Sequence, residues 1–137
     1  MLICFDTLEE MGIPGLNGGE GTVYAKMIRH AGGKTMLSRL PAGSSIGPHP
    51  HRDSWEINYV LSGIGEAVCD GQVEALTAGC CHLCPKGSIH SIRCTGGSRS
   101  SSRRKEEGHH EQSGYDDRLG HRDPLQRHVH LAAAGLH

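Results

Sequence analysis

Apolar and polar residues alternate in short runs between Thr22 and Gly96. The clearest runs are 22–28, 34–40 and 57–61, and none of them shows the sustained 3.6-residue period of an amphipathic helix. β-Branched and aromatic residues favour extended backbone in these runs, and glycine-containing turns separate them. The pattern therefore predicts an all-β domain of short antiparallel strands, arranged as a sandwich or a barrel.

The dipeptide Asp70-Gly71 is the strongest turn signal in the chain. It separates two extended runs, 66–69 and 72–76. Both central residues of a type I′ turn need positive φ, which Asp and Gly tolerate better than most residues. We therefore predict a β-hairpin at this position.

Composition divides the chain into three segments. Residues 1–21 are a glycine-rich N-terminal lead-in that we expect to be loosely ordered, and residues 22–95 form the β domain. Residues 96–137 are rich in Ser, Arg and His and hold six of the eleven histidines. We find no alternating apolar run there, and the only apolar cluster is 131–136. Low hydrophobicity predicts a disordered tail, with at most a short helix at that cluster.

Charge and cysteine content narrow the class of partner. The net charge of -1 and the pI near 6.8 give no global attraction for nucleic acid or an anionic membrane, so we expect a small molecule or a protein as partner. The first residues reach Asp6 without a basic segment, so we expect neither a signal peptide nor a membrane span. Six cysteines in this context indicate reduced thiols, and we expect a cytoplasmic protein.

Two histidines one residue apart are the main candidates for chemistry. In an extended strand alternate side chains share a face, so His49 and His51 project to the same side. Glu56 lies at an odd offset from them and can join them only if the chain bends at 52–54. Two neutral imidazoles and one carboxylate form a ligand set that first-row divalent metals accept, and His90 is a fourth candidate.

The spacing around these residues follows two patterns. The first is Gly43, five residues, His-x-His, four residues, Glu56, six residues and Gly63. The second is Gly79, five residues, Pro85, one residue, Gly87, two residues and His90. In order and spacing they resemble the two signature motifs of the cupin superfamily, over residues 43–94. One position differs, because the family usually has Asn where this chain has Cys94.

This resemblance implies an RmlC-like jelly-roll β-barrel. It also implies that one divalent ion (Mn, Fe, Ni, Co or Zn) is held by His49, His51, Glu56 and His90. Barrels of the family continue for two or three strands after the second motif, and the Ser/Arg/His-rich tail stands in their place here. The barrel is therefore expected to be incomplete at its C-terminal strands, with an uncovered sheet edge. The resemblance further implies a homodimer formed through the sheets.

The ligand set also indicates a class of chemistry. Three imidazoles and one carboxylate leave a divalent ion with a formal charge of about +1, which favours bound hydroxide, carboxylate or enediolate. We therefore expect a metal-binding protein that acts on a small oxygenated molecule, through isomerase, decarboxylase or dioxygenase chemistry. Two alternatives stay open: a non-catalytic module that binds a sugar or an acid, and a decayed cupin without activity.

The sequence Cys-Cys-His-Leu-Cys is a rival metal site. Cys80, His82 and Cys84 would share a strand face and could hold zinc. Structural zinc sites draw their ligands from two separated turns, and the sequence has no second pair at that spacing, so we expect half-buried strand residues instead. Trp55 and Tyr59 could line a pocket, but side chains this large more often belong to a core or an interface.

Overall fold

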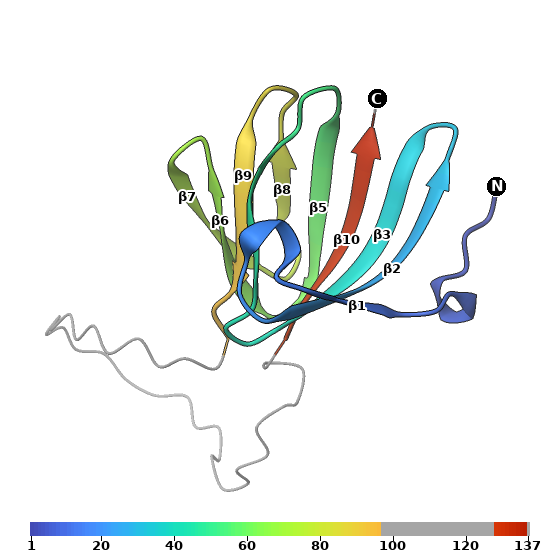
Figure 1. Ribbon diagram of the computed structural model, residues 1–137, viewed down its shortest axis with the longest axis horizontal. Coiled ribbons are helices and arrows are strands. Elements are labelled where there is room, and N and C mark those ends of the chain that lie inside the picture. Colours follow the sequence, from blue (N-terminus) through green and yellow to red (C-terminus); the bar gives the residue numbers. More distant parts are fainter. Residues whose placement is uncertain (97–127, 137) are drawn as a thin grey trace, which may run out of the picture.

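The computed structural model describes residues 1–96 and 128–136. Ten β-strands make up most of these two ranges, with two 3₁₀-helices near the N-terminus (Figure 1). The 3₁₀-helices are η1 (Phe5–Thr7) and η2 (Leu16–Gly18). The strands are β1 (Met11–Pro14), β2 (Thr22–His30), β3 (Gly33–Pro41), β4 (Ser45–Pro50), β5 (Trp55–Ser62), β6 (Ile64–Cys69), β7 (Gln72–Thr77), β8 (Cys81–Cys84), β9 (Ile89–Cys94) and β10 (His128–Leu136). No helix in the described ranges has the length and apolar character needed to cross a membrane.

The strands form two antiparallel sheets. The first has six strands in the order β1-β2-β3-β10-β5-β8, and the second has four in the order β4-β9-β6-β7. The chain crosses between the sheets several times, since β3 and β5 lie in the first sheet and β4 lies in the second. In Figure 1 the strands lie close together at one end of the molecule and spread apart at the other. The predicted all-β jelly roll is confirmed. Within the described residues the hydrogen-bond ladders of the two sheets stay separate, so the barrel is not closed.

An aliphatic core joins the two sheets. Its members come from strands of both sheets and are Val23, Leu40, Ile46, Val60, Ala67, Leu76, Ile92, Cys94, Val129 and Leu131. Leu16 of η2 packs against this cluster from the N-terminal segment. Each of these strands meets the core with its inward face, so burial of apolar surface is the main force that holds the sheets together.

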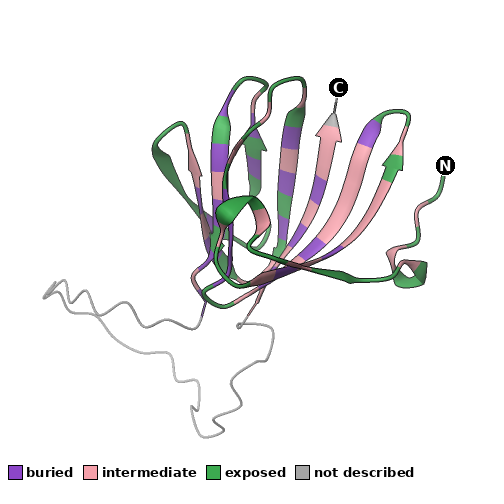
Figure 2. Cartoon of the chain, in the orientation of Figure 1, coloured by how far each residue is buried: buried purple, intermediate pink, exposed green. Residues whose placement is uncertain are grey.

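Strand β5 shows how the alternating pattern places side chains. Glu56, Asn58 and Val60 are buried between the sheets, whereas Trp55 and Tyr59 are 44% and 45% exposed. Successive side chains of a strand point to opposite faces, which produces the buried and exposed bands along β5 in Figure 2. The two aromatic residues therefore belong neither to the core nor to a pocket between the sheets.

The predicted hairpin at Asp70-Gly71 is confirmed. Its strands β6 and β7 pair in register from Ile64↔Thr77 to Cys69↔Gln72. Asp70 has φ 48° and Gly71 has φ 81°, as a type I′ turn requires. Asp70 also accepts a hydrogen bond from the backbone N–H of Ile89 at 3.0 Å, which ties the hairpin to β9.

The prediction for the tail is wrong at residues 128–136. These residues form β10, which lies between β3 and β5 and pairs with both. Val129, Leu131 and Ala133 are buried, so the segment does alternate, although its alanines weaken the apolar contrast. Neighbouring strands on both sides supply the hydrogen bonds that overcome the low strand propensity of alanine. Residues 97–127 of the predicted disordered tail lie outside the described residues.

The lead-in is more ordered than its glycine content predicts. Met11–Pro14 forms β1 and pairs with β2 as the first strand of the six-stranded sheet. The following residues pack directly on β4, where a Cβ at Gly19 would lie 2.1 Å from the carbonyl oxygen of Ser45. A Cβ at Gly47 would lie 2.2 Å from the carbonyl oxygen of Asn17. Only glycine allows this backbone contact, so these two glycines mark packing rather than flexibility.

Candidate metal centre

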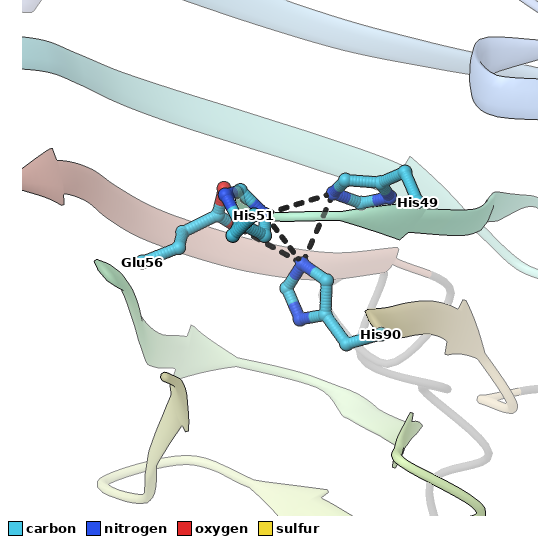
Figure 3. A group of neighbouring side chains, drawn as sticks. All are labelled: His49, His51, Glu56 and His90. Carbon is cyan, nitrogen blue, oxygen red and sulfur yellow. Dashed lines mark hydrogen bonds and ion pairs between the residues drawn. The ribbon is translucent and has the colours of Figure 1, made fainter. Parts of the chain in front are cut away.

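Strands of both sheets bring the four predicted ligands together. His49 on β4 lies opposite His90 on β9, because the two residues are a register pair of the second sheet. His51 directly follows β4, and Glu56 is the second residue of β5 in the first sheet. Residues 52–54 connect them and make the predicted bend. The four side chains point toward one another from these positions (Figure 3).

The donor atoms of the four side chains are closely spaced. The Nε2 atom of His51 is 3.1 Å from that of His49 and 3.1 Å from that of His90, and the remaining edge of this triangle is 3.0 Å. The Glu56 carboxylate places Oε2 3.1 Å from His51 Nε2 and Oε1 3.5 Å from His90 Nε2. All four ligand atoms lie within 4.8 Å of one another, so this group could hold one metal ion.

The separations between the three nitrogens can be compared with those around a bound metal ion. Adjacent donors about 2.1 Å from an octahedral ion are about 3.0 Å apart, whereas donors about 2.0 Å from tetrahedral Zn²⁺ are about 3.3 Å apart. The three nitrogens are separated by 3.0 to 3.1 Å, as on one face of an octahedron. The three nitrogens are therefore compatible with one face of a six-coordinate divalent ion.

Burial favours the neutral form of two histidines of the centre, which is the form that binds a metal. The pKa of His90 is lowered to about 3, first by burial and then by the neighbouring imidazoles. Burial also lowers the pKa of His51, although the Glu56 carboxylate opposes this shift. The Nδ1–H of His49 donates to the Gly47 carbonyl at 2.8 Å, which leaves the Nε2 lone pair free. Neutral imidazoles with free Nε2 lone pairs are the ligand form.

Asn58 is a residue of the centre that the sequence analysis missed. Its Nδ2 donates a hydrogen bond to Glu56 Oε1 at 2.8 Å, and both side chains are buried. The sequence could have indicated it, because Asn58 follows Glu56 by two residues and such residues lie on the same face of a strand. Asn58 therefore helps to fix the orientation of the Glu56 carboxylate through this hydrogen bond.

Comparison with known proteins identifies the family. The Cupin domain family matches residues 36–100. A curated relative, the oxalate-binding protein of Thermotoga maritima, is 33% identical over 90 residues, which cover 61% of this chain and 74% of the relative. The chain belongs to the cupin family. The resemblance inferred from the two sequence motifs is thereby confirmed.

Solved cupin structures share the fold of this cupin. A crystal structure from Thermotoga maritima, described as a predicted oxalate decarboxylase, aligns with a TM-score of 0.73 and 21% identity, covering 99% of this cupin and 98% of that chain. An RmlC-like cupin from Shewanella frigidimarina aligns with a TM-score of 0.65 and 16% identity, covering 98% and 87%. At these identities the likeness concerns the fold, and the chemistry must be argued from the site.

A cavity of about 340 Å³ adjoins the ligands. His49, His51 and Glu56 line it, and most of its remaining wall is apolar: Ile13, Leu16, Met27, Met36, Ile46 and Leu131. Arg29 of β2 and Lys34 of β3 bring two positive charges to the cavity and are a register pair. Within the described part of the chain neither of them forms an ion pair. The cavity thus combines a candidate metal centre with two cations, which suits an anionic ligand.

The rival cysteine site is not assembled. His82 and Cys84 face inward on β8 and are buried, whereas Cys80 and Cys81 are exposed. Burial, followed by the neighbouring Cys69, raises the pKa of the Cys84 thiol to about 12, so this thiol stays protonated and is a poor ligand. Among the residues that the structure describes, the only group of three or more metal-ligating side chains is the one described above.

The burial of the six thiols predicts how they react with Ellman's reagent. In the folded protein at pH 8 we expect Cys4, Cys80 and Cys81 to react rapidly and Cys69 slowly, because three of these thiols are exposed and one is partly buried. Cys84 and Cys94 are buried and should react only in denaturant. A Cys84→Ala variant is the control, since it should lower the denatured count alone. Six rapidly reacting thiols in the folded state would contradict the burial described here.

Proposed function

We propose that this cupin binds one divalent metal ion through His49, His51, Glu56 and His90 and uses it on a small carboxylic acid of about the size of oxalate. The observation that carries the proposal is the convergence of four ligand atoms within 4.8 Å beside a cavity of about 340 Å³. The nitrogen spacing supports a six-coordinate ion such as Mn²⁺, Fe²⁺, Co²⁺ or Ni²⁺. A bound ion of this kind supplies Lewis-acid polarisation of an oxygen ligand.

The charge and size of the cavity support an acid as the ligand. The guanidinium of Arg29 is a planar fork that matches a carboxylate, and the ammonium of Lys34 is a compact positive charge. The cavity is at the small end of the roughly 300 to 1,000 Å³ that ligand sites occupy, which favours a molecule of few atoms. The curated relative in Thermotoga maritima is an oxalate-binding protein, which supports the same class of ligand.

The chain's own residues would divide the work of binding. Arg29 and Lys34 would pair with a ligand carboxylate, and Asn58 would keep the Glu56 carboxylate in its ligating orientation. The apolar side chains of Met27 and Met36 would exclude water from the cavity and so strengthen the charge interactions inside it.

The same site also supports a second candidate function, a binding module without turnover. The observation that favours it is the name of the relative, which refers to binding rather than to a reaction. Both functions require the metal and the two cations, so they differ only in whether the bound acid is consumed. Following oxalate consumption and carbon dioxide release by the metal-loaded protein distinguishes an enzyme from a binding module.

Replacement of Lys34 by methionine tests the ligand class. Lys34→Met keeps most of the unbranched side chain and removes its charge, so we expect oxalate affinity to fall about tenfold or more, by loss of a charge-assisted contact. Metal content should not fall. Isothermal titration of metal-loaded full-length protein with oxalate measures the change.

Lys26 offers a matched control for that experiment. It lies on β2 but is not among the residues that line the cavity, so Lys26→Met removes the same charge elsewhere. We expect its oxalate affinity to stay within twofold of the wild type. Equal oxalate affinity in wild type and Lys34→Met, or no oxalate binding by the metal-loaded wild type, would contradict the proposed acid ligand.

A further inference from the structure

His82 is a fully buried histidine that the metal ligands contact but do not include. It lies on β8 and is 2% exposed. Its Nε2 is 2.8 Å from His90 Nδ1, and its Nδ1 is 2.5 Å from Glu74 Oε2. The side chain of Glu74, on β7, is 49% exposed. A continuous chain of polar contacts thus runs from a solvent-exposed carboxylate to one ligand of the candidate metal centre.

This chain of contacts joins strands of the two sheets. β8 is the last strand of the six-stranded sheet, and β7 is the last strand of the four-stranded sheet. The rings of His82 and His90 have planes 19° apart and centroids 5.1 Å apart, while the facing nitrogens are only 2.8 Å apart. The two rings therefore meet edge to edge through a hydrogen bond between nitrogens, rather than by stacking.

The direction of the hydrogen bonds follows from the acceptor at the outer end. The ionised Glu74 carboxylate can only accept, so Nδ1 of His82 carries the proton that it donates. Metal ligation through His90 Nε2 requires the proton of His90 on Nδ1, and His82 Nε2 can accept that hydrogen bond when its single proton is on Nδ1. His90 Nε2 then has a free lone pair, and this is the atom that faces His49 and His51.

We propose that Glu74 and His82 are positioning residues for the metal centre, which hold the proton of His90 on Nδ1 and direct its Nε2 at the ion. The inference rests on the proposed metal-binding function. It assigns a role to the Cys-His-Leu-Cys segment other than a zinc site. Outer partners of this kind typically change metal affinity about 10- to 100-fold.

The tautomer of His90 tests the inference without any metal. Full-length protein labelled with ¹⁵N-histidine and stripped of metal is examined by long-range ¹H–¹⁵N NMR, with the His90 signals assigned from a His90→Gln variant. We expect the Nδ1–H tautomer in the wild type. Glu74→Lys replaces the acceptor by a donor, so His82 Nδ1 should accept, its Nε2–H should face His90, and the Nδ1–H signature of His90 should be lost. An unchanged His90 tautomer in Glu74→Lys would overturn the inference.

Metal affinity provides the second readout. We expect Co²⁺ to bind Glu74→Lys and His82→Phe 10- to 100-fold more weakly than the wild type, measured by competition with a chromophoric chelator. Glu66→Lys is the matched control, because it makes the same charge change on β6 of the same sheet, and its affinity should stay within twofold of the wild type.

The two readouts separate failure of the inference from failure of the proposed function. Wild-type protein that binds Co²⁺ no more tightly than a His49→Ala/His51→Ala variant would overturn the metal function, and the NMR result alone would then decide the tautomer. Wild-type protein that binds Co²⁺ stoichiometrically, with Glu74→Lys within twofold of it, would overturn the positioning role. Should His82→Phe not fold, the half-exposed Glu74 still gives a variant outside the core.

Discussion

Replacing His51 by alanine is expected to lower the affinity for Co²⁺ by more than about a hundredfold, beyond the effect of losing an outer partner. The reason is its central position, because His51 Nε2 is 3.1 Å from the ligand nitrogens of both His49 and His90. It is also 3.1 Å from Glu56 Oε2. Loss of this imidazole removes one donor and leaves a gap between the remaining three. After dialysis against a weak chelator, elemental analysis should show a metal content of one ion per chain in the wild type and nearly none in His51→Ala.

A histidine elsewhere in the described fold provides the control for His51→Ala. His30 ends β2 and contacts Thr35 through Nε2 at 2.9 Å, away from the four ligands. His30→Ala should keep the full metal content, even though it removes the same side chain. The chelator is needed because histidines outside the centre bind divalent ions weakly. If His51→Ala and His30→Ala both retained one ion per chain, the proposed centre would be wrong.

Removal of β10 is expected to abolish the cooperative fold. The strand pairs with β3 from His128↔Pro41 to Leu136↔Gly33 and with β5 along its other edge, so its loss splits the six-stranded sheet. It also removes Val129 and Leu131 from the core, where burial of the valine contributes about 1.5–3 kcal/mol and truncation of the leucine costs about 2–5 kcal/mol. The sum approaches the 5–15 kcal/mol that stabilises a typical domain. A chain that ends at residue 127 should therefore show no cooperative urea transition by circular dichroism.

Point variants in β10 give a graded version of this test. Leu131→Ala should keep the fold and lower the free energy of unfolding by about 2–5 kcal/mol, because Leu131 is 1% exposed. Ala132→Ser on the same strand is the control, since Ala132 is only partly buried, and it should change stability by less than about 0.5 kcal/mol. A truncated chain with the urea midpoint of the full chain would show that β10 is dispensable.

Local features of the fold could be predicted because they depend on neighbours in the chain. The hairpin at Asp70-Gly71 needs only two residues that accept positive φ. The shared direction of His49 and His51 needs only the alternation of a strand. The framing of these residues by glycines at defined intervals then indicated a cupin, and it supported His90, in a different strand, as the fourth candidate ligand.

Features that depend on distant strands could not be predicted in the same way. The segment 128–136 has three consecutive alanines, and nothing within it reveals that β3 and β5 leave a place between them. His82 was considered only beside the cysteines of its own segment, although its partners Glu74 and His90 each lie eight residues away. Arg29 and Lys34 are a register pair of β2 and β3, and nothing in the sequence indicated that both line the cavity.

The sequence by itself determined the family, the all-β class and the identity of the four candidate ligands, because each is encoded in residue types at short, defined intervals. The tertiary structure alone decided that β10 completes the six-stranded sheet, that two cations share the cavity, and that Glu74 reaches His90 through His82. The physical reason is that these contacts join strands of different sheets or distant segments. Which strands become neighbours is set by the burial of the whole core, and no short stretch of residues carries that information.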